Sequence, residues 1–388
     1  MRRTRAWQCR TRLLALLIHS PPPHRQNLDF GAAGYLPFGF GDLFVDPHLK
    51  TPYVYQYNLT VERQLANGFM AEIGYLGSSS HKLLTWSDIN PIIPGTTNRL
   101  INVQERLTAQ TGFAPLPNSF AGLNNANYNA FEASLTKRMG AVRSVGSMFF
   151  TLAYTWSHNL DNGSGFNQRT SNIPYFNRHE LYSNSDFDMR NRLVLSGGWD
   201  LPFADLWATG PKRLTHGWSL YPIFFVQSGI PLDLNAGLGN PQEAVPGPSG
   251  AGDPQLIRPD QLTSHVQTFD PRHQQTINGL TGNYYFNPTD FAPDPCIGLG
   301  TCPLGFYGTF RRNSFVGPSR VNLDLALEKA TNLVGDQVKL GFRVEAFNIL
   351  NHTQFKNPGS INVGSPSLGL VSTTYDPRIL QLALRLTF

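Results

Sequence analysis

The sequence predicts an all-β protein: an antiparallel transmembrane β-barrel, or half of one, with about nine or ten long strands, short periplasmic turns and long extracellular loops. Three observations predict this fold. Apolar and polar residues alternate over long segments, a pattern typical of strands with one apolar face. Most of these segments reach about 12 to 15 residues, whereas strands of soluble proteins cluster around 5 to 6. The connections between them alternate between short and long.

The alternation is clearest near the end of the chain. The segment VNLDLALEKA, which starts at Val321, places Val321, Leu323 and Leu325 on one face and Asn322 and Asp324 on the other. The same pattern recurs at 338–346, 380–388 and 148–157. Over the whole chain it predicts strands near 53–65, 69–81, 127–138, 146–158, 188–201, 216–228, 318–331, 337–351 and 377–388. A tilted membrane strand needs about 9 to 11 residues, and these lengths meet that need.

The predicted connections form an independent test. Their ranges are 66–68, 82–126, 139–145, 159–187, 202–215, 229–317, 332–336 and 352–376. Short and long ones alternate strictly, and Asn67-Gly68 is a tight-hairpin pair. With the short connections in the periplasm, the first and last strands run in the same direction. Single-chain bacterial barrels have even strand numbers, so we expect either a larger barrel or a tenth strand within 30–45.

The polar residues of the strands indicate which face is turned inward. A lysine or arginine that faces lipid near the bilayer midplane costs about 2–4 kcal/mol. We therefore expect the polar face to line the lumen. The candidate lumen-lining residues are Glu132, Arg190, Arg192, Asp324, Lys339, Arg343, Glu345 and Arg385. Their mixed signs favour a mutual charge network over a ligand path. Near strand ends, Tyr57, Trp86, Trp156, Trp199 and Trp218 either form interfacial girdles or simply pack there.

Net charge argues against nucleic acid as a partner. The net charge of +5 is carried by five arginines within the first twelve residues, so no basic binding face remains. Residues 1–28 form a separate leader-like segment, with a short apolar run that resembles a secretory signal only weakly and that a non-native start would also explain. Residues 29–388 are expected to form the barrel.

Several segments resemble those of Oar-like outer-membrane proteins of the TonB-dependent-receptor type, which are common in acidobacteria. The segments are PYVYQYNLTVERQL at 52–65, EIGYLGS at 72–78, NYNAFEASLTKR at 127–138, LAYTWSHNLD at 152–161, FDMRNRLVLSGGWDLPF at 187–203, QSGIPL at 227–232 and FRVEAFNILNHTQF at 342–355. Their order and spacing cover residues 50–388.

The resemblance implies the C-terminal part of a large barrel in the cell outer membrane of a Gram-negative-type organism. It also implies that Phe388 is the terminal aromatic signal for the barrel assembly machinery. Full-length relatives look like a β-sandwich, a plug and a barrel of about 22 strands. The sequence contains no recognisable sandwich, plug, TonB-binding segment or first half of the barrel. Energised transport would therefore need a longer chain that supplies the plug and contacts TonB.

Three cysteines are present, and two of them point to a disulfide. Cys296 and Cys302 lie in the longest predicted loop, where the oxidising cell exterior favours a local disulfide. Metal binding would need two further ligands with recognised spacing. Cys9 lies in the leader-like segment. We expect no metal and no cofactor.

Enzyme motifs are not convincing in this sequence. His179 lacks the second histidine of a zinc-protease helix, because Ser183 stands four residues later. The glycines around Ser164 have the wrong spacing for a nucleophile elbow. Asp186 and Asp188 are suited to bind calcium or to act as paired carboxylates, but opening a strand at a solvated rim is the favoured role. We expect no catalytic residues.

The predicted function is a receptor or transporter for a bulky nutrient, an oligosaccharide or a peptide, with the long loops as the binding surface. Outer-membrane lipid is an expected partner. A non-transporting structural, adhesive or porin-like surface protein is the alternative. A secreted β-sandwich that binds carbohydrate would explain the alternation but not the strand lengths.

Overall fold

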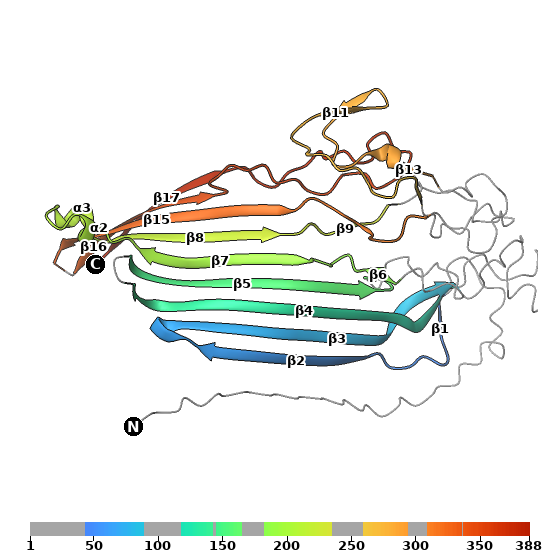
Figure 1. Ribbon diagram of the computed structural model, residues 1–388, viewed down its shortest axis with the longest axis horizontal. Coiled ribbons are helices and arrows are strands. Elements are labelled where there is room, and N and C mark those ends of the chain that lie inside the picture. The colour runs from blue at the N-terminus through green and yellow to red at the C-terminus, as the bar shows by residue number, and fades with distance from the viewer. Residues whose placement is uncertain are drawn as a thin grey trace, which may run out of the picture.

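The computed structural model describes residues 43–88, 118–142, 145–164, 182–234, 259–293, 309–335 and 337–388. Nine long strands form one open antiparallel sheet, and each lies beside its neighbour in the chain (Figure 1). From edge to edge they are β2 (Tyr53–Gln64), β3 (Phe69–Asp88), β4 (Asn118–Val142), β5 (Gly146–Asp161), β7 (Asn191–Asp200), β8 (Trp218–Gln227), β15 (Arg320–Val334), β16 (Val338–Phe347) and β17 (Ile379–Thr387). The predicted all-β fold of long antiparallel strands is confirmed, and the sheet is open, as expected of a barrel half.

Short and long connections alternate as predicted. The turn Ala66–Gly68 joins β2 to β3, with Asn67 and Gly68 at φ 59° and 76°, the left-handed region that Asn and Gly adopt most readily. The connection between β7 and β8 contains two short helices, α2 (Phe203–Leu206) and α3 (Lys212–Thr215). Figure 1 shows these helices and the C-terminus at the same end of the sheet. We assign this end to the periplasm because barrels keep their short turns there.

Two strands are much longer than predicted. β3 continues to Asp88, and β4 already begins at Asn118. The connection between them therefore spans 89–117 and not 82–126. The sequence pattern failed here because register shifts between Ser80, Leu83 and Leu84 interrupt the alternation. Beyond the bilayer, moreover, neither face needs to be apolar.

The predicted tenth strand is not an extra member of the meander in the described structure. Within residues 30–45, only β1 (Leu43–Val45) is described, and it pairs in parallel with the first residues of β4, at the extracellular end of that strand. Residues 30–42 lie outside the described ranges.

The two faces of the sheet differ sharply in composition. Strand register places Leu327 beside Val344 and Leu220, and Leu195 beside Leu152 and Phe224. One step along, Glu328 lies beside Arg343 and Ser219, and Ser196 beside Thr151. Apolar side chains therefore occupy one face across the sheet, while most polar side chains lie on the other, together with a few apolar ones such as Ile223 and Phe225. We call the second one the polar face.

Aromatic residues lie at two levels of the apolar face. At the periplasmic level, the Trp199 and Trp218 indole N–H groups donate to the carbonyls of Val145 and Leu214, at 2.6 and 2.7 Å. At the opposite level stands Trp156, on the same strand as Met148, which pairs with Trp199. Eight residues separate Met148 from Trp156, or about 26 Å along a strand. This spacing is close to the height of about 25 Å of a barrel's apolar band, which favours interfacial girdles. The Trp86 side chain lies outside the described part.

The extracellular connections fold into a small domain with its own core. We call it the loop cap and define it as residues 231–234, 259–293, 309–316 and 352–376. It contains β9 (Pro231–Leu232) paired with β14 (Phe315–Val316), β10 (Asp260–Gln261) with β13 (Phe291–Ala292), β11 (Gln275–Ile277) with β12 (Leu280–Gly282), and η4 (Pro288–Asp290). Its buried core consists of Leu234, Phe286, Phe291, Phe310, Val363 and Leu368. Long-range backbone bonds join its parts, such as Tyr285 N–H to Gly369 O at 2.8 Å.

Among the described residues, no helix is both long and apolar enough to cross a membrane.

Candidate functional site at the extracellular rim

Seven of the eight candidate lumen residues share the polar face. Glu132 pairs with Thr155, which pairs with Arg192 on the other side, and this row continues through Gln227. The remaining members are Asp324, Lys339, Arg343, Glu345 and Arg385. The eighth, Arg190, precedes β7 and lies at the rim.

Only one part of this face is a compact charge network. Arg343 Nε lies 2.8 Å from Glu345 Oε1, and Arg343 Nη1 lies 3.2 Å from Glu328 Oε2. The guanidinium also lies 5.1 Å from the centre of the Tyr221 ring. Glu328 was not a candidate, although the alternation that selected Asp324 also places Glu328 on this face. Among the described ion pairs, none involves Glu132, Arg192, Asp324, Lys339 or Arg385.

A second network lies at the rim, where the strands end. Asp188 is buried, and its carboxylate accepts from the backbone N–H of Asn159 and from Arg190 Nε, both at 2.7 Å. Arg190 also donates to Asn184 Oδ1 at 3.0 Å. The favoured role of Asp186 and Asp188, at a solvated rim, therefore needs correction for Asp188. Its carboxylate is enclosed between the end of β5 and the residues that lead into β7.

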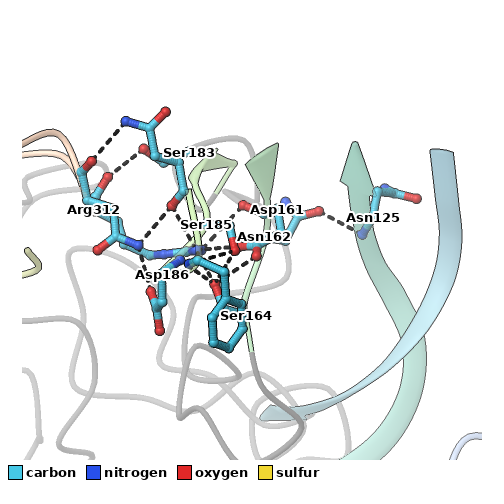
Figure 2. Close-up of polar contacts among 11 residues, drawn as sticks. Asn125, Asp161, Asn162, Ser164, Ser183, Ser185, Asp186 and Arg312 are labelled. Atoms are coloured by element: carbon cyan, nitrogen blue, oxygen red, sulfur yellow. Dashed lines mark hydrogen bonds and ion pairs between the residues drawn. The ribbon is translucent and has the colours of Figure 1, made fainter. Parts of the chain in front are cut away.

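The centre of the rim network is Arg312, whose side chain is 2% exposed. Its guanidinium forms an ion pair with Asp161 at the end of β5 and donates to Asn184 O at 3.1 Å and to Ser164 Oγ at 3.2 Å. Figure 2 shows Arg312 close to Asp161 and Ser164. Each partner comes from a strand end or its adjoining turn, so one loop-cap residue joins several parts of the rim.

Neighbouring residues extend this attachment. Asn313 Nδ2 donates to Asp186 Oδ1 at 2.6 Å and to Asn184 O at 2.8 Å. Ser164 Oγ donates to Asp161 Oδ2 at 2.7 Å and accepts from the Asp186 N–H at 2.8 Å. Ser164 and Asp186 thus hold the rim together, and the network fixes the loop cap to the barrel wall.

Four ionisable groups outside the strands have shifted pKa values, and one of them is Arg272, whose pKa is raised by its hydrogen bond to Asp270. Burial raises the pKa of Tyr285 to about 12. Burial also raises the pKa of Tyr182, near the rim. The Arg272 side chain, by hydrogen bonding, lowers the pKa of Asp270 to about 2. Asp270 and Arg272 are well exposed, and solvent screens exposed pairs strongly.

Some predicted features fall outside the described residues: Cys9, Cys296, Cys302 and His179. The disulfide therefore stays a prediction. Phe388 is described; it follows β17 and is 95% exposed. Sequence reasoning missed Arg312 and Arg320, because Arg312 belongs to an irregular loop and Arg320 begins a strand where alternation has barely started.

The strand lengths, the apolar face and the two aromatic levels define a class of protein, the outer-membrane β-barrel. The sequence matches the family described as "Outer membrane beta barrel domain" over residues 10–381. The chain belongs to this family and is a protein of the outer membrane.

Solved structures similar to this chain were also found. One is the outer membrane transporter YddB from Escherichia coli, with 11% identity and a TM-score of 0.44, covering 87% of this chain and 33% of that one. Another is FpvAI in its complex with pyocin S2, with 10% identity and a TM-score of 0.40, covering 88% and 28% respectively. The chain thus spans about a third of the length of these structures. A search of curated proteins found no match.

Proposed function

We propose that the protein forms part of the barrel wall and the extracellular binding surface of an Oar-like protein of the TonB-dependent-receptor type. This receptor takes up a bulky nutrient, either an oligosaccharide or a peptide. The proposal includes a plug and a TonB contact supplied by a longer chain, insertion by the barrel assembly machinery, and no enzymatic activity. The ordered segments that resemble this family, from 52–65 to 342–355, support the receptor type.

One structural observation carries the binding role. The long extracellular connections form a cap with a shared hydrophobic core, and Arg312 attaches that cap to the strand ends through a buried ion pair. A large ordered surface at the outer end of a barrel is pre-organised to bind a ligand without first paying the entropy of loop ordering. Loops with no role in recognition would not need such a core.

The test measures binding and uptake separately. Full-length protein in detergent is screened against oligosaccharide and peptide arrays, and bacteria that carry the protein are assayed for uptake of each hit. Phe286→Ala should disrupt the cap core and abolish binding. The matched control is Leu206→Ala, at an exposed residue of α2 on the periplasmic side, which should not affect binding.

Uptake that stops when the inner-membrane proton gradient is dissipated would support the receptor. The porin-like or adhesive alternative is favoured by the many polar residues on the inner face of the sheet. Gradient-independent diffusion with open-pore conductance in planar bilayers would replace the proposal with the porin. Binding to cell surfaces without any uptake would replace it with the adhesin.

A further inference from the structure

We infer that the extracellular end of the polar face holds an anion-binding site formed by Arg320, Arg192 and Lys356, which takes the carboxylate or phosphate group of a ligand. The inference deepens the proposed receptor function and rests on it only in placing the site on the ligand's path.

Strand register brings the two arginines together. Arg192 on β7 and Arg320 on β15 pair with the same residue of β8, Gln227, from its two sides. Adjacent strands lie about 4.8 Å apart, so the two backbones are about 10 Å apart. Both side chains start from the polar face, and Arg192 is exposed.

The loop cap supplies the third cation and the aromatic support. The Arg320 guanidinium lies 3.6 Å from the centre of the Tyr375 ring and 5.2 Å from that of Phe225. Lys356 Nζ lies 5.3 Å from the same Tyr375 ring centre, so the two charged groups are within about 9 Å of each other, each at cation–π distance. A backbone bond from Tyr375 N–H to Gln354 O, at 2.8 Å, helps to hold this part of the cap in place.

The cations lack a neutralising partner. No ion pair within the described residues includes Arg192, Arg320 or Lys356. The nearby acids are Glu132, which lies two strands from Arg192 in the same row, Asp324, whose carboxylate accepts from Asn322 Nδ2 and Asn348 N–H at 2.8 Å, and the exposed Asp376. Like charges this close repel one another, and a bound anion would relieve that repulsion.

Two buried polar atoms at the same place have no hydrogen-bond partner in the described structure: Arg320 Nε and Gln354 Oε1. Gln354 is joined to the strand through its Nε2, which donates to Asn322 Oδ1 at 2.9 Å, two residues from Arg320. Buried polar atoms are normally satisfied. A guanidinium that rests on a ring keeps its N–H edge available, and this edge matches carboxylate and phosphate geometry. The unpartnered Nε–H of Arg320 therefore points to an acceptor such as an anion, whereas Gln354 Oε1 is itself an acceptor and is suited to a hydroxyl group or a water molecule.

The test is calorimetric titration of the detergent-solubilised full chain with citrate and, separately, with inorganic phosphate at low ionic strength. We expect saturable binding of at least one of them, which also tells which anion class is preferred. Arg320→Gln should weaken association roughly ten- to a hundred-fold, as loss of a charge-assisted hydrogen bond implies. Lys356→Gln and Arg192→Gln, both at exposed positions, should weaken it without affecting folding.

The matched control is Arg213→Gln, which removes the same charge from α3 at the periplasmic end and should leave binding unchanged. Absence of saturable binding with both probes, or equal weakening by Arg213→Gln, would overturn the inference and would indicate water at the two buried atoms. Such a failure would leave the receptor proposal standing, with an uncharged nutrient as the ligand. Loss of energised uptake with anion binding retained would instead overturn only the receptor proposal.

Discussion

Breaking the buried ion pair between Arg312 and Asp161 should release the loop cap from the barrel rim. Their side chains are 2% and 6% exposed, so Arg312→Gln leaves the Asp161 charge buried with its main partner removed. Removing one member of a buried pair costs about 3–5 kcal/mol. The fraction of molecules with a detached cap should rise about a hundred- to several-thousand-fold. The sheet itself should remain folded, because its strand pairing does not involve Arg312.

Hydrogen exchange measured by mass spectrometry on the solubilised protein distinguishes local from global opening. Amides in 182–188 and 309–316 should exchange faster in Arg312→Gln, while those in β15 and β16 should not change. Arg272→Gln is the matched control, because it removes an exposed ion pair from the same cap and should change little despite the low Asp270 pKa. The double variant Arg312→Gln/Asp161→Asn should lose less than the sum of the single variants. Unchanged exchange at 309–316, or an equal effect of Arg272→Gln, would refute the reasoning.

Three further predictions concern the sheet, its end and the cap. Leu195→Arg, on the apolar face of β7, should destabilise the membrane-inserted protein by about 2–4 kcal/mol, whereas Ser196→Arg, on the polar face, should not. Urea titration in lipid vesicles, read out on a heat-modifiability gel, measures the stability of both variants. Equal effects would contradict the assigned faces. Deletion of Phe388 should lower the yield of assembled protein in outer-membrane fractions without changing the stability of molecules folded in detergent, whereas an unchanged yield would exclude the proposed assembly signal. Tyr285 has a pKa of about 12 in the folded cap against an ordinary value of 10.0. The unfolded cap therefore loses this proton first, so cap stability should be constant below pH 10 and should fall as the pH rises toward 12. Tyr285→Phe should remove this alkaline loss of stability in hydrogen-exchange measurements, and an identical loss in that variant would assign it to another group.

The central strands could be predicted because the membrane imposes one rule on them. Along β16, lipid requires Leu340, Phe342 and Val344 on one face, so Lys339 and Arg343 must take the other. The rule ends with the bilayer: β3 runs on to Asp88, through bulges that destroy the alternation. Charge partners were predictable only in part, because alternation assigns Arg343 and Glu328 to a face but does not show that they are directly opposite.

The rim was the least predictable region, since its contacts join residues far apart in sequence. Arg312 reaches Asp161, and Asn313 reaches Asp186, through a long irregular connection. No local pattern specifies such a pair. The sequence marked Asp186 and Ser164 as unusual; metal and nucleophile chemistry were weighed for them, and a rim role was favoured for Asp186. Their hydrogen bonds support a structural role at the rim.

Three arginines illustrate how the protein handles positive charge, and the comparison separates structural from binding residues. Arg343 is neutralised by two glutamates within its own sheet, and Arg312 is buried against one aspartate. In both, carboxylate partners neutralise the charge. Arg320 rests on aromatic rings, which tolerate its charge without neutralising it. A site that must bind and later release an anion needs a cation held in place by groups that do not compete for it, and Arg320 is the one of the three arginines that meets this condition.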